Sequence, residues 1–145
     1  MSDPPTLFQN VRFLTGPVHA GFPSPGAEYE EKRLSLDDLV VPHPISTYYM
    51  RIVGDSMVGA CLHHGDIIIV DRALTPSHNK IVVVRVGESL TLKRLQLVGR
   101  KVFLKPENSA YPVMEVTGQD YEIWGVVTYV LSKVTGARPR SAPRQ

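Results

Sequence analysis

From residue 47 onward, the hydrophobic residues come in short runs separated by polar turns, and no long stripe repeats with the period of a helix. The runs are rich in β-branched, aromatic and aliphatic side chains, which favour strands. Glycine, asparagine, aspartate and serine stand between them, as is typical of tight turns. The predicted strands span 47–53, 66–70, 80–86, 89–97, 101–105, 113–117 and 121–134. Short strands at close spacing predict a compact, mostly β domain over residues 34–134.

The first 33 residues follow neither the strand period nor the helix period. Seven of the 12 prolines precede residue 45, so we expect residues 1–33 to form an extended N-terminal arm outside any core. A short helix is predicted at 35–39, with Ser35 as its N-cap and Asp38 in its first turn. At the other end, residues 135–145 carry three arginines and two prolines and are predicted to be a disordered, solvated basic tail.

Length, composition and net charge limit the classes of protein to which this chain can belong. The length of 145 residues suits one domain with a real core, and 43% hydrophobic with 21% charged residues is ordinary for a globular protein. A net charge of +2 is too small to argue for nucleic-acid binding by electrostatics alone. One cysteine excludes an intrachain disulfide, and no run approaches the ~18 apolar residues of a membrane span. We therefore expect a cytoplasmic protein without a membrane anchor.

The sequence GDSM, residues 54–57, places Ser56 in a turn between two predicted strands. This serine is either a nucleophile or an ordinary turn residue, and a neutral hydroxyl needs a base before it can attack. Of five histidines, only His63 and His64 lie near it in sequence. The chain lacks the G-x-S-x-G motif, and its mostly β pattern does not fit an α/β-hydrolase.

Lysine is the other candidate base. In the strand 89–97, Lys93 and Arg94 point to opposite faces, and each face also carries leucines. Only lysine can lose its proton, because arginine stays charged. Lowering a lysine pKa from about 10.4 to near 7 by burial costs roughly 4–5 kcal/mol. Strand parity alone favours a lysine whose ammonium reaches solvent from an exposed strand.

Cys61, His63 and His64 lie close together, but a structural zinc site needs four ligands. Three clustered ligands without a fourth more often form a plain turn, so we predict neither a metal site nor another cofactor.

Six segments, taken in order, resemble the UmuD members of the LexA/UmuD family of self-cleaving serine–lysine proteins. They are GFPSP at 21–25, HPISTYYMRIVGDSM at 43–57, GDIIIVDR at 65–72, TLKRLQL at 91–97, PENSAYP at 106–112 and IWGVVTYV at 123–130. Each motif alone is weak, but their shared order over residues 18–133 makes the resemblance specific. It implies a fold like the LexA C-terminal β domain.

The resemblance implies a serine endopeptidase in which Ser56 is the nucleophile and Lys93 the general base. It implies self-cleavage between Ala20 and Gly21, with backbone N–H groups around Asp55 and Ser56 stabilising the oxyanion. Two local departures stand out. UmuD proteins usually have cysteine where this chain has Ala20, and Asn79-Lys80 replaces a usual Gly-Asp, which puts a surface contact there in doubt.

The resemblance also implies partners in the bacterial SOS response to DNA damage. A RecA–single-stranded DNA filament would promote cleavage. The cleaved homodimer would then join a UmuC-type Y-family polymerase as the accessory subunit of error-prone translesion synthesis (SOS mutagenesis). No small-molecule substrate is implied.

Three other classes of protein share part of this pattern. Residues 1–45 are too short and too proline-rich for the helix-turn-helix of a LexA-type repressor. A signal peptidase would share the serine–lysine chemistry but needs a membrane anchor. The remaining alternative is a non-catalytic, β-rich regulatory subunit that binds a polymerase, in which Ser56 and Lys93 are structural.

Overall fold

The computed structural model describes residues 11–23, 26, 30–32 and 35–135. The chain divides into two compact units, residues 1–42 and residues 43–145. The arm predicted over residues 1–33 belongs to the first unit. The predicted basic tail lies outside the described residues, apart from Thr135.

The first unit contains a two-residue antiparallel ladder between β1 (Phe13–Leu14) and β2 (Glu31–Lys32), followed by helix α1 (Leu36–Val40). Next to the ladder, the Thr15 N–H donates to the Glu30 carbonyl at 2.9 Å. The ladder was not predicted, because two residues are too few to produce a hydrophobic alternation. The predicted helix is confirmed with Ser35 at its N-cap, although the Ser35 side chain makes no capping hydrogen bond.

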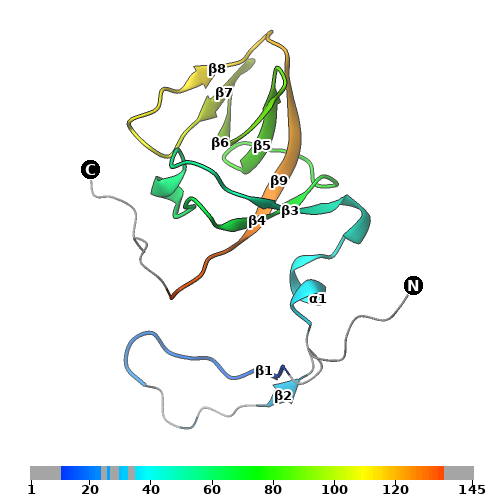
Figure 1. Ribbon diagram of the computed structural model, residues 1–145, viewed down its shortest axis with the longest axis vertical. Coiled ribbons are helices and arrows are strands. Elements are labelled where there is room, and N and C mark those ends of the chain that lie inside the picture. Colours follow the sequence, from blue (N-terminus) through cyan, green and yellow to red (C-terminus); the bar gives the residue numbers. More distant parts are fainter. Residues whose placement is uncertain (1–10, 24–25, 27–29, 33–34, 136–145) are drawn as a thin grey trace. The chain divides into compact units, whose positions relative to one another are not determined.

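The second unit is built on one antiparallel sheet of seven strands, in the order β3-β4-β9-β5-β6-β7-β8 (Figure 1). The strands are β3 (Thr47–Arg51), β4 (Ile67–Asp71), β5 (Ile81–Val86), β6 (Ser89–Val98), β7 (Lys101–Lys105), β8 (Met114–Glu115) and β9 (Tyr121–Leu131). Two short 3-10 helices, Pro44–Ser46 and Val58–Ala60, precede β3 and β4 respectively. The predicted mostly β class is confirmed. The largest difference is at β8, where only two of the five predicted residues pair.

Strand β9 joins the two halves of the sheet. Its first half pairs with β5 and its second half with β4, and the register shifts once in each ladder. Such bulges bend a strand and increase its twist. In Figure 1 the strands β3 and β4 therefore lie along one half of β9, while β5 to β8 lie along the other half.

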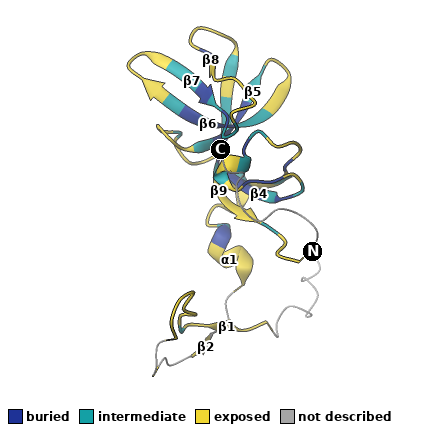
Figure 2. Ribbon diagram, turned by 90° about the vertical axis from the view of Figure 1, so that its left-hand side faces the viewer, coloured by how far each residue is buried: buried dark blue, intermediate teal, exposed yellow. Residues whose placement is uncertain are grey.

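This bend gives the sheet two hydrophobic clusters. The first cluster contains the buried residues Ile52, Met57, Leu62, Ile68, Val70 and Val83. The second contains Val82, Val84, Leu95, Leu104, Val116 and Val126. Figure 2 shows buried positions along β4 and in the middle of β6, whereas the two ends of β6 are exposed. Because Val82 and Val83 are neighbours on β5 and point to opposite faces, this strand contributes to both clusters.

Leu104 tests the second cluster, since its side chain is fully buried at 0% exposure. We expect Leu104→Ala to lower the free energy of unfolding by about 3 kcal/mol, through lost burial and the cavity left behind. Leu97→Ala is the matched control, because Leu97 on β6 is 41% exposed, and it should cost under about 1 kcal/mol. Urea unfolding measures both; equal losses would contradict this description of the core.

Candidate active site

Ser56 lies in the turn between β3 and the 3-10 helix Val58–Ala60. Gly54 opens this turn with a φ of +98°, a conformation that favours glycine. On the other side of the serine, Met57 is only 1% exposed and packs in the first hydrophobic cluster. Its carbonyl accepts hydrogen bonds from the N–H groups of Ala60 and Leu62. The C-terminal side of the turn is therefore anchored in the core while Ser56 itself stays partly exposed.

Lys93, in the middle of β6, reaches this turn. Its Nζ lies 3.3 Å from Ser56 Oγ, 3.2 Å from Thr91 Oγ1 and 3.2 Å from the Leu92 carbonyl oxygen. Lys93 is only 8% exposed. The alternation of side chains along the strand had favoured an ammonium that reaches solvent, and this expectation is wrong. The alternation of side chains could not show which face of β6 is buried at Lys93, because both faces carry leucines.

Arg94 points to the opposite face of β6. Its guanidinium pairs with the Glu107 carboxylate and donates to the Asn79 carbonyl at 2.7 Å. Of the two neighbouring cations, the structure therefore brings the lysine to Ser56 and gives the arginine an acidic partner.

Burial lowers the pKa of the Lys93 ammonium, because leaving water disfavours its charged form. None of the ion pairs among the described residues includes Lys93. No carboxylate contact therefore offsets the desolvation. The arrangement can therefore supply a neutral amine next to a serine hydroxyl at a lower pH than a solvent-exposed lysine could.

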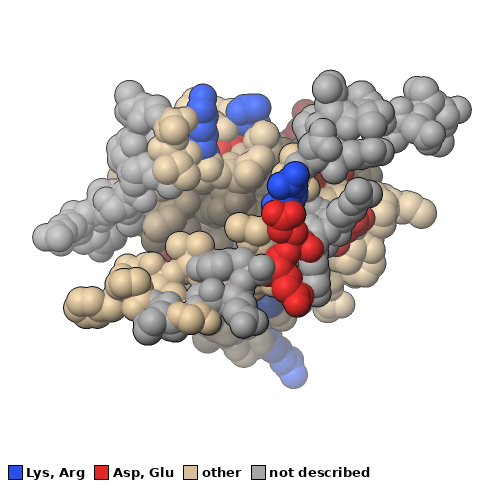
Figure 3. All heavy atoms as spheres, turned by 90° about the horizontal axis from the view of Figure 1, so that it is seen from below, with Lys and Arg blue, Asp and Glu red and all other residues tan. Residues whose placement is uncertain are grey.

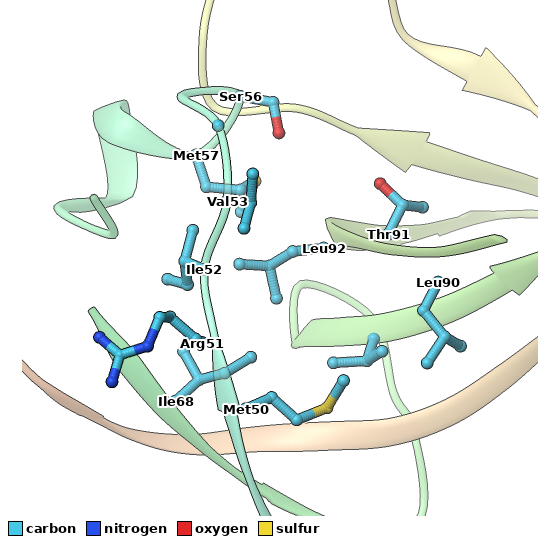
Figure 4. A pocket seen from close by; sticks show the side chains of 12 residues that line it. Met50, Arg51, Ile52, Val53, Ser56, Met57, Ile68, Leu90, Thr91 and Leu92 are labelled. Carbon is cyan, nitrogen blue, oxygen red and sulfur yellow. The ribbon is translucent and has the colours of Figure 1, made fainter. Parts of the chain in front are cut away.

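A cavity of about 280 Å³ opens beside the serine. It is lined mainly by apolar side chains, including Met50 of β3, Ile68 of β4, and Leu90 and Leu92 of β6. In Figure 4 the hydroxyls of Ser56 and Thr91 point toward each other at one end, and Met50 lies toward the other end. The cavity can hold an apolar chain segment with its backbone near the serine.

The turn is also held by the segment 106–111, which follows β7. The Asn108 side-chain amide donates to the Asp55 carbonyl at 2.9 Å, and the Tyr111 hydroxyl donates to the Asp55 carboxylate at 2.6 Å. In the sequence, these residues stand out only as part of the motif PENSAYP. Their contacts join positions 53 and 56 residues apart, so no local pattern could have indicated them.

The histidines considered as bases lie elsewhere. His64 Nδ1 accepts a hydrogen bond from the Gly54 N–H at 3.1 Å, and His63 is buried beside Asp66. Among the described residues, no hydrogen bond joins a histidine to Ser56. Cys61 is exposed, and within the same part of the chain no group of three or more His, Cys, Asp or Glu side chains could hold a metal ion.

Ala20 and Gly21 lie in the first unit, in a segment without regular secondary structure. Both are exposed, and the neighbouring Val18 and Phe22 are 90% and 93% exposed. A bond in such a segment is open to attack.

Comparison with known proteins identifies the family. The family model for peptidase S24-like proteins matches residues 12–128. The chain belongs to this family. It is 42% identical over 124 residues to Protein MucA of Salmonella typhimurium, with 84% of each chain covered, and 41% identical over 114 residues to Protein SamA of the same species, with 79% of each covered. The LexA repressor of Acidovorax sp. is 32% identical over 123 residues, which cover 84% of this chain and 54% of the repressor. The resemblance found from the six motifs is thereby confirmed.

Two further findings concern helix length and surface charge. In the part of the chain that the structure describes, no helix is long and apolar enough to cross a membrane. On the face shown in Figure 3, the coloured side chains form small groups of both signs, so the described residues visible there form no continuous basic surface.

The lowered pKa of Lys93 predicts a pH-dependent stability. Below the folded-state pKa, the buried ammonium is a constant cost to folding. As the pH rises from there toward the unfolded value of ~10.4, the unfolded chain holds more protons, and the native state gains stability. Lys93→Met should therefore raise the free energy of unfolding at pH 7, by roughly 1 kcal/mol, with a gain that shrinks toward pH ~10.4.

Urea unfolding at several pH values measures the gain in the free energy of unfolding. Every chain compared carries Ser56→Ala, so that no reaction at the serine interferes. Lys101→Met is the matched control, because the Lys101 side chain is 66% exposed on β7. A gain for Lys93→Met that does not change with pH would contradict the lowered pKa.

Proposed function

We propose that this protein is a self-cleaving serine endopeptidase of the UmuD type, in which Ser56 attacks the Ala20–Gly21 bond and Lys93 is the general base. The observation that carries the proposal is the buried Lys93 amine, 3.3 Å from the Ser56 hydroxyl. A serine needs an adjacent base, and a desolvated lysine is one of the few side chains that can act as one near neutral pH.

The contacts of Lys93 fit a neutral amine. A neutral amine has two N–H donors and one lone pair. Thr91 Oγ1 and the Leu92 carbonyl can accept the two N–H groups, at 3.2 Å each. The lone pair is then left for the proton of the Ser56 hydroxyl. Thr91 and the Leu92 carbonyl thus orient the base, while burial favours its neutral form.

The reaction would run in two steps. Lys93 takes the Ser56 proton as Oγ bonds to the Ala20 carbonyl carbon, and the resulting ammonium then gives that proton to the departing Gly21 nitrogen. Water, deprotonated by Lys93, next hydrolyses the Ala20 ester and regenerates Ser56. The products are residues 1–20 and 21–145.

The oxyanion would be stabilised by backbone N–H groups of the turn around Asp55 and Ser56. The Gly54 N–H is already occupied by His64 Nδ1. No hydrogen bond from the Asp55 or Ser56 N–H occurs among the described residues. These two donors therefore remain available for a carbonyl oxygen that reaches the serine.

The substrate segment belongs to the same chain, so no high-affinity site is needed. A tethered segment has an effective concentration in the millimolar range. The apolar cavity beside Ser56 would accept the small and apolar residues around Ala20. A RecA–single-stranded DNA filament would accelerate the placement of this segment, as the family resemblance implies.

Cleavage can be tested directly. At alkaline pH, where more Lys93 is neutral, we expect the purified protein to lose residues 1–20 slowly without any filament. Ser56→Ala and Lys93→Ala should each lower this rate at least ~100-fold, because nucleophile and base act as a unit. Mass spectrometry of the products measures both the rate and the cut position.

Lys101→Ala is the control for loss of a lysine on the same sheet and should cleave at the wild-type rate. Continued cutting between Ala20 and Gly21 in both Ser56→Ala and Lys93→Ala would refute the assignment. A wild-type chain that stays intact would favour the alternative of a non-catalytic subunit that binds a polymerase.

The second part of the proposal is that the product works as a homodimer with a UmuC-type Y-family polymerase in translesion synthesis after DNA damage. The polymerase partner rests on the family resemblance.

The sheet of the second unit supports the proposal of a dimer. On the face of β3, β4 and β9 that points away from the first cluster, Tyr49, Ile69 and Tyr129 stand in register. Tyr49, Tyr129 and the nearby Leu131 are 57%, 45% and 52% exposed. Strand β3 is also the edge of the sheet.

This surface predicts the effect of a charge on self-association. A glutamate at position 131 would have to be desolvated at the interface, so Leu131→Glu should weaken the dimer at least ~10-fold. Leu97→Glu, at a 41% exposed leucine on β6, is the matched control and should leave it unchanged. Sedimentation at micromolar concentration measures the dimer, and a wild-type protein that sediments only as a monomer would contradict this part of the proposal.

A further inference from the structure

The turn that carries Ser56 is anchored unequally on its two sides. After the serine, Met57 is buried in the first cluster. Before the serine come Gly54, whose backbone has the freedom of glycine, and Asp55, which is exposed. Because the position of Oγ depends on the backbone on both sides, the Gly54–Asp55 side must be held by something other than the core.

The segment Glu107–Tyr111, here called the strap, makes four contacts around the site, and two of them hold Asp55. Asn108 donates to the Asp55 carbonyl, and Tyr111 donates to the Asp55 carboxylate. The Glu107 carbonyl accepts the Gly59 N–H at 2.7 Å, and the Glu107 carboxylate pairs with Arg94. The strap thus contacts the turn before and after Ser56.

The strap also reaches the strand that carries the base. Arg94 is the residue after Lys93 on β6, and its ion pair with Glu107 links that strand to the strap. The approach of the strap to the turn is close, since a Cβ at position 59 would meet the Glu107 carbonyl oxygen at 2.5 Å. The strap therefore touches both elements whose separation sets the distance between Oγ and Nζ.

The orientation of the Asn108 side chain is set by a second contact. Its Oδ1 accepts the Ala110 N–H at 2.9 Å, so its amide nitrogen is the atom left to face the Asp55 carbonyl. The Tyr111 N–H donates to the Asn108 carbonyl at 3.1 Å, which places the phenol near Asp55. The strap is folded on itself before it contacts the turn.

We propose that Asn108 and Tyr111 are positioning residues of the peptidase reaction: through Asp55 they hold Ser56 where its hydroxyl meets Lys93. This inference rests on the proposed function of Ser56 and Lys93. Both hydrogen bonds are solvent-exposed, so they add little to global stability. Their loss should act on rate, because a displacement of about 1 Å at a reacting group can cost on the order of 100-fold.

The test compares four full-length variants with the wild-type chain. Asn108→Ala and Tyr111→Phe each remove one contact to Asp55, and the second change deletes a single hydroxyl from an exposed ring. Gln119→Ala is the control for the amide, because Gln119 also donates to a backbone carbonyl, that of Glu115, at 2.9 Å. Tyr121→Phe, on a tyrosine packed against the second cluster, is the control for the hydroxyl.

The readouts are the rate constant of self-cleavage from neutral to alkaline pH, and the Tm. Asn108→Ala and Tyr111→Phe should each lower the plateau rate about 10-fold, with the midpoint of the pH profile unchanged, because the surroundings of Lys93 stay intact. Their Tm values should match those of the two controls. Plateau rates equal to those of the controls, or a rate loss explained by a fall in Tm, would overturn the inference.

A fluorophosphonate probe separates placement of the serine from placement of the arm. In this reaction the Ser56 oxygen bonds to phosphorus, fluoride leaves, and the hydroxyl proton passes to Lys93. We expect labelling of Ser56 to slow by the same ~10-fold in both strap variants. Normal labelling with slow cleavage would show that the strap acts on the arm instead, and would overturn the inference. Ser56→Ala is run beside the four variants to test the proposed function itself, which fails if this chain is still cut between Ala20 and Gly21.

Discussion

Burying a primary ammonium group is costly, and the second unit of this protein buries one in the middle of strand β6. The cost is acceptable only if the site is rigid, because the amine must keep its few hydrogen-bond partners. The hydrogen-bond partners of Lys93 Nζ are two oxygens of its own strand, from Thr91 and Leu92, and the hydroxyl oxygen of Ser56. Lys93 is only 8% exposed, so little water reaches the amine. The same burial that lowers its pKa also makes it useful as a base.

The rest of the unit holds a serine against that amine. Strand β3 ends at Arg51, the chain turns at Gly54, and Met57 fixes the far side of the turn in the first cluster. The bent strand β9 lets one sheet form two clusters, so the second can support β6 and β7 while the first supports the turn. Residues 107–111 then connect turn and strand. The geometry of the site thus depends on segments that are far apart in sequence.

Much of this fold is predictable from the sequence, because runs of β-branched, aromatic and aliphatic residues, separated by turn residues, mark each of the seven strands. Helix α1 and the candidates Ser56 and Lys93 were also found, although only the family motifs joined the two as a pair. Three features were out of reach. The alternation of side chains along β6 does not indicate which of its two cations is buried. The β1–β2 ladder is too short to show a pattern. The contacts of Asp55 with Asn108 and Tyr111 span more than 50 residues. Each depends on tertiary packing and not on local propensity.

The central claim is that Lys93 is neutral when it takes the proton of Ser56. A ¹³C NMR titration of the Lys93 Cε in the Ser56→Ala chain, with the signal assigned by its loss in Lys93→Met, measures the pKa of this amine directly. The account predicts a pKa well below the usual ~10.4, and a midpoint that coincides with the rise of the self-cleavage rate of the wild-type chain with pH. A Lys93 that titrates at ~10.4, or a cleavage rate that rises with a different midpoint, would contradict it.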